Sequence, residues 1–449
     1  MSSDLTFSKK LETDIVSIIN DLANKLKTPD LVEGAVLDKK NVTLLGRVHP
    51  WDPLTLSHGF PGSILFFSEM NKAYPGEGWD YVAHQHISYV TPYLEQGFRS
   101  VSLFGGVTGL AFAVHSASNK GQRYKNYLSK LDKVIIEETY NQLENEKFRK
   151  GLGASPAFYD VIQGLAGVGR YCLERQSYSH LFNKVLKEIL SSFINMSRPI
   201  VSGTKKIPGW YISRENQFLN KDKIKYPHGN FNTGLAHGIL GPLSLMALCI
   251  LKGIEVKHQR ETIKYISDWL IEQMKYDSTG YPVWPHRVSL EELLEEKSNA
   301  FDKREGWCYG NPGVARVLYL AGAALNHSDY KQVSMGGFLG IIDRGLENTE
   351  LESPTFCHGK AGLLQILIRM KSDTRDENLD QLINELAAEL TQQYNYSAPL
   401  GFEDLEISEG NINKITKAGL LEGSTGAGLS LLSLLFEKEC EWDKTFLIN

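Results

Sequence analysis

The sequence predicts an all-α protein, an α/α toroid of seven inner and seven outer helices with a small strand-containing insertion. The first observation is a Gly-x-x-Gly tetrad that recurs seven times, each time before an apolar, helix-forming run. The second is that amphipathic segments lie between these runs. A period of 47 to 74 residues accommodates two helices, and such hairpins bury their apolar faces only by stacking on neighbours. We expect one toroid domain over residues 1–449, with an open α-solenoid as the alternative.

The tetrads mark the starts of the expected inner helices. A residue without Cβ lets crowded helix starts approach closely and permits positive φ. The runs that follow, such as GPLSLMALCIL from Gly241, are apolar on every side, which is typical of buried helices. One match could arise by chance among 40 glycines, but seven matches before apolar runs indicate a repeat. The tetrads are Gly59–Gly62, Gly106–Gly109, Gly164–Gly167, Gly238–Gly241, Gly310–Gly313, Gly359–Gly362 and Gly423–Gly426.

The segments between the runs are expected to form the outer helices. HLFNKVLKEILSSFINM, from His180, places apolar residues three and four apart with charges between them, which predicts one solvated face.

Two inserts interrupt the alternation of inner and outer helices. Residues 199–230 are rich in turn formers, β-branched and aromatic residues, which predicts a small strand-rich extension within the domain. The second insert spans roughly 277–305. We expect both inserts to shape a cleft at the glycine-rich end, and mere decoration is an equal alternative.

The composition and charge of the chain exclude some classes of protein. The chain is 42% hydrophobic and 22% charged, and no stretch approaches the roughly 20 apolar residues that span a bilayer, so we expect no transmembrane segment. The N-terminus lacks the order of a signal peptide, which predicts a cytoplasmic protein. A net charge of −5 without a block of basic residues argues against nucleic acid as a partner.

Two of the five cysteines stand in the same register of successive repeats. Cys308 and Cys357 each lie two residues before the first glycine of a tetrad, and His358 follows Cys357. Equivalent positions of neighbouring repeats lie side by side, so these residues are expected to meet. Two cysteines and a histidine suit zinc, and three protein ligands leave an open, catalytic position. The alternative is a pair of buried structural cysteines, which is our interpretation of the three off-register cysteines, Cys172, Cys249 and Cys440.

Other polar residues precede the tetrads. His237 stands directly before Gly238 and is a candidate for proton exchange near neutral pH. Asp160 is a candidate to orient or charge-stabilise His237, and Arg304 and Tyr309 flank Cys308. The alternatives are helix capping for Asp160 and His237, a surface ion pair for Arg304 and core packing for Tyr309. We interpret two further residues in this register, His58 and Glu422, as structural caps.

The motifs resemble those of a known family. WCYGNPG from Trp307, CHGKAG from Cys357, LAHGILG from Leu235 and YDVIQG from Tyr159 are similar to the signature blocks of the lanthionine synthetase C-like family, the cyclases of lantibiotic biosynthesis. The resemblance extends from about residue 51 to about residue 436 and is to the stand-alone cyclases. It implies an α-toroid with one zinc ion on Cys308, Cys357 and His358.

The resemblance also implies a reaction. Peptide cysteine thiols add to dehydroalanine or dehydrobutyrine, forming lanthionine and methyllanthionine rings in a dehydrated, leader-bearing precursor peptide. It implies His237 as the acid/base residue, Asp160 as its partner, and Arg304 and Tyr309 as lining residues. It further implies a dehydratase and an exporter as partners, which would place the protein peripherally at the membrane.

Two other functions remain open from the sequence. A protein prenyltransferase also activates a peptide thiol on zinc, but it needs a second subunit and usually a carboxylate ligand. A cyclase-like zinc protein that binds glutathione or partner proteins would keep the zinc ligands without forming thioethers. Incubation with dehydrated precursor or with an isoprenoid diphosphate distinguishes these functions.

Overall fold

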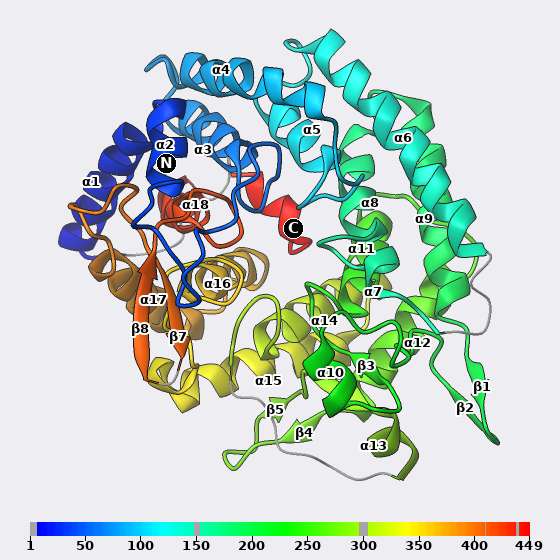
Figure 1. Cartoon of the computed structure of the whole chain (residues 1–449). Coiled ribbons are helices and arrows are strands. Elements are labelled where there is room, and N and C mark those ends of the chain that lie inside the picture. The colour runs from blue at the N-terminus through cyan, green and yellow to red at the C-terminus, as the bar shows by residue number, and fades with distance from the viewer. Residues whose placement is uncertain (1–6, 148–152, 296–303, 409, 437–439) are drawn as a thin grey trace. The chain divides into compact units, whose positions relative to one another are not determined.

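The computed structural model describes residues 7–147, 153–295, 304–408, 410–436 and 440–449 (Figure 1). The chain divides into two compact units, which are treated separately below. Unit 1 comprises residues 1–100, 104–132 and 346–443, and unit 2 comprises residues 101–103, 133–345 and 444–449.

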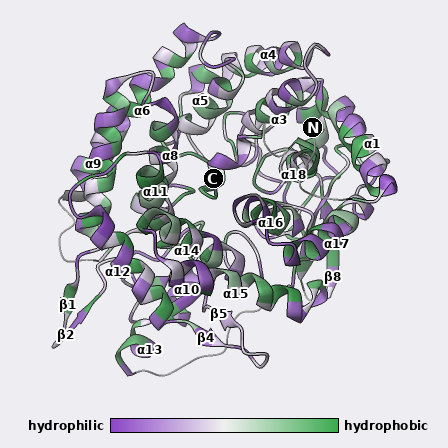
Figure 2. Ribbon diagram, turned by 180° about the vertical axis from the view of Figure 1, so that it is seen from behind, coloured by the Kyte–Doolittle hydropathy of each residue, from purple (hydrophilic) through white to green (hydrophobic). Residues whose placement is uncertain are grey.

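Each tetrad lies at the start of a buried helix. In Figure 2, α11 is mostly hydrophobic, as its apolar run predicts. The inner helices of unit 1 are α3 (Phe60–Ala73), α5 (Val107–Ser116), α16 (Lys360–Thr374) and α18 (Ser424–Phe436). Those of unit 2 are α8 (Leu165–Arg175), α11 (Leu240–Leu251) and α14 (Asn311–Leu325).

Amphipathic helices cover the inner ones. In α9 a buried stripe includes Phe182, Leu186 and Phe193, and Ser179 caps the first turn by accepting a hydrogen bond from the Leu181 amide. Unit 1 contains α1 (Lys9–Leu26), α2 (Pro29–Val36), α4 (Trp79–Val90) and α17 (Asn378–Gln392), and α6 spans Lys125–Lys147. Unit 2 contains α9 (His180–Met196), α12 (Gln259–Glu272) and α15 (Ser328–Arg344). None of the described helices is long and apolar enough to cross a membrane.

The tetrad glycines are needed chiefly because neighbouring backbone lies close to them, and less often because their own backbone angles are unusual. A Cβ on Gly359 would lie 2.3 Å from the Ser353 carbonyl oxygen, although Gly359 has an ordinary φ of −129°. Gly310 combines both needs: its φ is +136°, and a Cβ would lie 2.5 Å from the Arg304 carbonyl oxygen. The expectation of positive φ is therefore wrong at positions such as Gly359, and the expectation of close approach is confirmed.

Backbone hydrogen bonds join the tetrad loops of successive repeats. In unit 2, the Val161 amide donates to the Ala236 carbonyl at 3.1 Å, and the Leu235 amide donates to the Cys308 carbonyl at 3.0 Å. In unit 1 the sixth loop donates to the seventh, the seventh to the first, and the first to the second. Residues in the same register thus lie side by side within each unit, as the repeat predicted.

Short strands accompany both inserts, which confirms the strand-containing part of the predicted fold class. β3 and β6 pair with each other and join the two inserts within unit 2. The sequence did not predict the β7–β8 hairpin of unit 1. The strands are β1 (Ile200–Ser202), β2 (Lys205–Ile207), β3 (Asn230–Asn232), β4 (Lys275–Tyr276), β5 (Pro282–Val283), β6 (Arg287–Ser289), β7 (Asp404–Ser408) and β8 (Asn411–Ile415). The remaining helices are α7 (Pro156–Tyr159), α10 (Asn220–Lys225), α13 (Leu290–Glu295), η1 (Thr91–Gln96), η2 (Leu346–Asn348) and η4 (Trp442–Phe446).

The last residues of the chain form part of the core of unit 2. The Trp307 indole donates to the Phe446 carbonyl at 3.1 Å, and the Arg316 guanidinium donates to the Ile448 carbonyl at 2.8 Å. Phe446 and Ile448 are completely buried.

We expect Ile448→Ala to lower the free energy of unfolding by about 2–5 kcal/mol, because it leaves a cavity in a packed core. Ile224→Ala, at a side chain that is 80% exposed, is the control, with an expected change within about 0.5 kcal/mol. Equal effects in chemical denaturation would contradict this placement.

A buried histidine in unit 1 predicts a pH-dependent stability. His86 is completely buried, its Nε2 lies 3.1 Å from the Leu26 carbonyl oxygen, and burial lowers its pKa to about 4. The unfolded chain binds this proton with a pKa near 6.5, so stability is complete above pH 6.5 and declines as the pH falls towards 4. The loss reaches about 3 kcal/mol. His86→Gln keeps a donor for Leu26 but does not titrate, so unfolding curves at several pH values should show a shallower decline. An unchanged slope would argue against this assignment.

Candidate functional site

His237 and Asp160 form a hydrogen-bonded pair in unit 2. The His237 Nδ1 lies 2.6 Å from Asp160 Oδ2. Because a carboxylate accepts, Nδ1 carries the hydrogen, and Nε2 is the ring nitrogen that Asp160 leaves available. The Asp160 side chain is fully buried, whereas the His237 side chain is 30% exposed. The imidazole is thus oriented on its inner side and accessible on its outer side.

The carboxylate of Asp160 is itself fixed by the third tetrad loop. Its Oδ1 accepts hydrogen bonds from the backbone amides of Gln163 at 2.6 Å and Gly164 at 2.8 Å, immediately before α8. One oxygen therefore holds the loop while the other holds His237. The orienting interpretation of Asp160 is consistent with this geometry, whereas the capping interpretation is wrong, because α8 begins after Gly164 without a side-chain cap.

Tyr309 is the centre of a second polar group in unit 2. The Asn232 amide of β3 donates to the Tyr309 hydroxyl at 2.9 Å, and Arg287 of β6 lies 3.5 Å from the same oxygen. Arg287 also pairs with Asp222 of α10 at 2.8 Å. Burial raises the pKa of Tyr309, and Arg287 and Asn232 offset part of that rise. The phenol is therefore a neutral group held by side chains of β3 and β6.

Cys308 and Arg304 lie on the fifth tetrad loop of unit 2. Cys308 is 8% exposed, and its carbonyl accepts the Leu235 amide from the loop that carries His237. The Arg304 side chain is exposed. The neighbouring Glu305 is buried and pairs with Arg344 at 2.6 Å. The loop places Cys308 in the interior and Arg304 at the surface.

The other two predicted metal ligands lie in unit 1. Cys357 and His358 are half-buried on the sixth loop, immediately before α16. The ligand atoms of Cys357, His358 and Glu422 all lie within 4.8 Å of one another. Because the thiolate, imidazole and carboxylate in this cluster are all groups that bind zinc, these residues fit a zinc ion. Cys308 belongs to unit 2, so its meeting with Cys357 and His358 stays a prediction.

Glu422 is held by a half-buried lysine. Lys417 lies 2.8 Å from Glu422 Oε2 and 2.7 Å from the Asp404 carboxylate. Burial raises the pKa of Glu422, but Lys417 outweighs this effect and the pKa falls to about 2. The carboxylate is thus ionised, and its other oxygen, Oε1, lies 4.0 Å from His358 Nδ1.

Two further histidines lie beside Glu422. The ligand atoms of His49, His58 and Glu422 also lie within 4.8 Å of one another. Burial, then the positive charge of Lys417, lowers the pKa of His49 to about 3. Burial likewise lowers the pKa of His58. Both imidazoles are therefore neutral near pH 7.

The capping interpretation of His58 and Glu422 is wrong. Helix α3 begins after Gly59 without a side-chain cap, and the Glu422 carboxylate pairs with Lys417 instead. The missed signal was the register. His58, His358 and Glu422 each stand directly before the first glycine of a tetrad, in the first, sixth and seventh repeats. The same rule that paired Cys308 with Cys357 also places these three residues together.

The remaining cysteines match the interpretation as buried structural residues. Cys172 and Cys249 are completely buried, and Cys440 is 4% exposed. Burial raises the pKa of Cys249 to about 12 and also raises the pKa of Cys440. The thiols of Cys249 and Cys440 therefore stay protonated, and all three cysteines are inaccessible.

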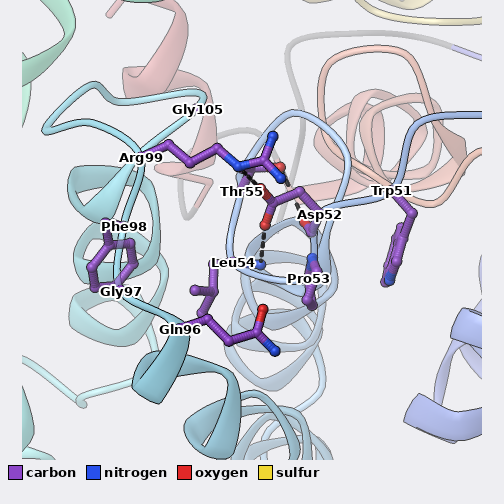
Figure 3. A pocket seen from close by; sticks show the side chains of 10 residues that line it. All are labelled: Trp51, Asp52, Pro53, Leu54, Thr55, Gln96, Gly97, Phe98, Arg99 and Gly105. Carbon is purple, nitrogen blue, oxygen red and sulfur yellow. Dashed lines mark hydrogen bonds and ion pairs between the residues drawn. The ribbon is translucent and has the colours of Figure 1, made fainter.

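A pocket of about 310 Å³ opens beside the first and second tetrads of unit 1 (Figure 3). Arg99 reaches across it to Asp52, at 3.6 Å, and Asp52 accepts the Leu54 amide at 3.1 Å. Trp51, Phe98 and the segment before Gly106 complete the wall. The pocket is lined by none of the predicted site residues.

Comparisons with known proteins agree with the motifs. The model of the family described as "Lanthionine synthetase C-like protein" matches residues 50–447. The "Nisin biosynthesis protein NisC" of Lactococcus lactis subsp. lactis is 27% identical over 362 residues, which cover 78% of this chain and 82% of that protein. The solved structure of "Nisin cyclase" matches with a TM-score of 0.76 and 22% identity over 98% of both chains.

These matches confirm the predicted α/α-toroid fold class and the predicted class of enzyme, lanthionine synthetase. The family match over residues 50–447 agrees with the extent of about 51 to about 436 that the motifs predicted. The chain belongs to the lanthionine synthetase C-like family.

Proposed function

We propose that this protein is a zinc-dependent cyclase that adds peptide cysteine thiols to dehydroalanine and dehydrobutyrine, forming lanthionine and methyllanthionine rings in a lantibiotic precursor. The observation that carries the proposal is the Cys357–His358–Glu422 cluster in a chain related to a nisin biosynthesis protein. The oriented His237 imidazole supports it independently.

Cys308, Cys357 and His358 are the proposed ligands of one zinc ion. A bound zinc ion supplies a deprotonated thiol at neutral pH, where a free thiol with a pKa near 8.5 is mostly protonated. Two cysteine thiolates already balance the charge of a divalent ion, so a peptide sulfur held beside them stays electron-rich and nucleophilic.

His237 is the proposed proton carrier. The peptide sulfur forms a bond to the β-carbon of the dehydro residue, and the electrons of the double bond move towards the adjacent carbonyl. The α-carbon must then receive a proton, which balances the proton that the thiol has lost. His237 Nε2 is suited to deliver it, because Asp160 holds Nδ1 and stabilises the charged imidazolium. Tyr309 and Arg304 are the proposed lining residues.

The substrate we propose is a dehydrated precursor peptide that carries its leader. A dehydratase must supply such a substrate, and a peptide exporter is the proposed consumer of the product. We further propose that the protein acts in the cytoplasm, peripherally at the membrane through these partners.

Mass spectrometry after thiol alkylation tests the function. Ring formation leaves the mass of the peptide unchanged but removes its free thiols. The protein should therefore protect a dehydrated precursor from alkylation, and it should leave the same precursor unprotected when that precursor has not been dehydrated. Transfer from an isoprenoid diphosphate, or tight glutathione binding without any protection of dehydrated peptides, would replace this function with one of the alternatives.

A further inference from the structure

We propose that residues 218–225 form a peptide-binding surface of unit 2 that continues outward from His237. This surface, called the α10 surface below, consists of Phe218, Leu219 and helix α10 (Asn220–Lys225). Its occupant is a stretch of the peptide substrate in which acidic side chains lie between apolar ones. The inference rests on the proposed function, but its main test uses peptides that cannot cyclise.

The α10 surface begins at the proposed proton carrier. The Phe218 ring packs against the His237 imidazole, with ring centroids 5.7 Å apart and an angle of 62° between the ring planes. Phe218 is nevertheless 47% exposed, so much of its side chain remains accessible to a bound molecule. A peptide whose reacting residue lies at His237 therefore has Phe218 within reach of its neighbouring residues.

Two further apolar side chains are exposed on the α10 surface. Leu219 is 49% exposed and Ile224 is 80% exposed. Asp222 faces the interior, and Ile224 lies about 200° further around the helix, on the solvated side. Exposed apolar side chains that are grouped in this way and flanked by charges are typical of surfaces that bind a protein or a peptide.

The charge of α10 selects an acidic partner. The helix carries Lys221, Lys223 and Lys225, and its one carboxylate, Asp222, is buried and pairs with Arg287 at 2.8 Å. The α10 surface is thus positive in a chain whose net charge is −5. Lysines beside exposed apolar side chains complement a peptide segment that contains both acidic and apolar residues.

The α10 surface is held in place at its ends and in its middle. The buried Gln217 amide donates to the Tyr226 carbonyl at 2.9 Å, which joins the two residues that flank the surface. Arg287 links Asp222, at 2.8 Å, to the Tyr309 hydroxyl, at 3.5 Å. Because the surface is already ordered and is tied to the candidate site, a peptide that binds it loses little free energy to ordering the protein.

A membrane is the main competing partner. Basic residues beside exposed apolar side chains also suit a bilayer that contains anionic lipids. The contact between Phe218 and His237 favours the peptide, because the same ring then serves the binding surface and the site of the proposed reaction. Anionic vesicles are therefore included in the test.

Fluorescence anisotropy with the purified full-length chain tests the inference. The probe is a short fluorescein-labelled peptide in which glutamates separate leucines and phenylalanines, without cysteine or dehydro residues. It should bind more tightly than peptides with lysine in place of glutamate or serine in place of the apolar residues, and binding should weaken as salt is added. Phe218→Ala should weaken binding at least about tenfold. Lys221→Gln combined with Lys223→Gln should weaken it about threefold or more.

The matched controls lie on the β1–β2 hairpin of the same insert, which stands apart from α10 in Figure 1. Val201→Ala changes an exposed apolar side chain, and Lys205→Gln combined with Lys206→Gln changes two exposed lysines. All three residues lie outside the α10 surface, so affinity for the probe should remain unchanged. An equal loss of affinity in these controls and in the α10 variants would contradict the inference.

Other results would also overturn the inference. One is a wild-type chain that does not bind the acidic probe, or that binds the lysine peptide equally well. Another is a chain that binds vesicles of anionic phospholipid through Phe218 and Lys221 but does not bind the probe, which would assign the surface to a membrane.

A kinetic measurement separates this inference from the proposed function. With dehydrated precursor, the lysine variants should raise KM and leave kcat unchanged, because they remove binding that is equal in the ground state and the transition state. An active cyclase whose KM does not change in these variants would overturn the inference and leave the proposed function intact. Absence of cyclisation would leave the anisotropy results unaffected.

Discussion

Cys308→Ala is expected to abolish ring formation, with a rate decrease of more than about 100-fold. Loss of an outer-shell partner of a metal already lowers activity by about 10–100-fold, and loss of a ligand should exceed that. One thiolate fewer also makes the peptide sulfur beside the metal less electron-rich and less reactive. The measurement is the rate at which thiols of a dehydrated precursor become resistant to alkylation.

Cys249→Ala is the matched control for this prediction. Cys249 is also a buried cysteine of unit 2, but it lies within the apolar helix α11. Its replacement should leave the rate unchanged while slightly lowering stability. Equal rates for Cys308→Ala and the wild type, with both proteins folded, would remove Cys308 from the proposed reaction.

His237→Gln is expected to lower the rate about 100- to 10,000-fold, the range over which a positioned acid/base residue contributes. Glutamine preserves polarity and approximate size but cannot carry a proton to the α-carbon. Zinc content should remain unchanged, because His237 is not a proposed ligand. Exchange in deuterated solvent provides a second measurement, since the face at which deuterium enters the α-carbon should lose its uniformity.

Asp160→Asn tests the orienting partner. The asparagine amide can donate to His237 Nδ1, which shifts the hydrogen to Nε2 and removes the lone pair from the exposed side of the ring. We expect a lower rate and an altered pH profile, which a merely structural effect would not produce. A normal pH profile together with a normal rate would show that the 2.6 Å contact serves only the third tetrad loop.

Much of the fold follows from local sequence. The inner helices were predictable because each consists of one apolar run after a glycine tetrad, and the outer ones because their apolar residues recur at helical spacing. The β7–β8 hairpin was not predicted. Its strands alternate weakly, with exposed Ile407 and Ile412, so no buried face appears in the pattern.

The site was predictable where register determined proximity. The positions of Asp160 and His237 before successive tetrads led to their predicted contact, which the structure contains, although their catalytic roles stay predictions. The register of the tetrads also places His358 beside Glu422. From the sequence, however, Glu422 was interpreted as a structural cap. His49 and Lys417 lie outside any repeat position, and only tertiary packing brings them beside Glu422. No spacing in the sequence could have indicated them.

The central claim is that one zinc ion is held by cysteines of two repeats. Zinc X-ray absorption of the purified wild-type chain, combined with metal analysis, tests it most directly. We predict one zinc per chain with two sulfur ligands and at least one imidazole nitrogen in its shell. A protein that contains no zinc, or zinc with at most one sulfur ligand, would contradict the account.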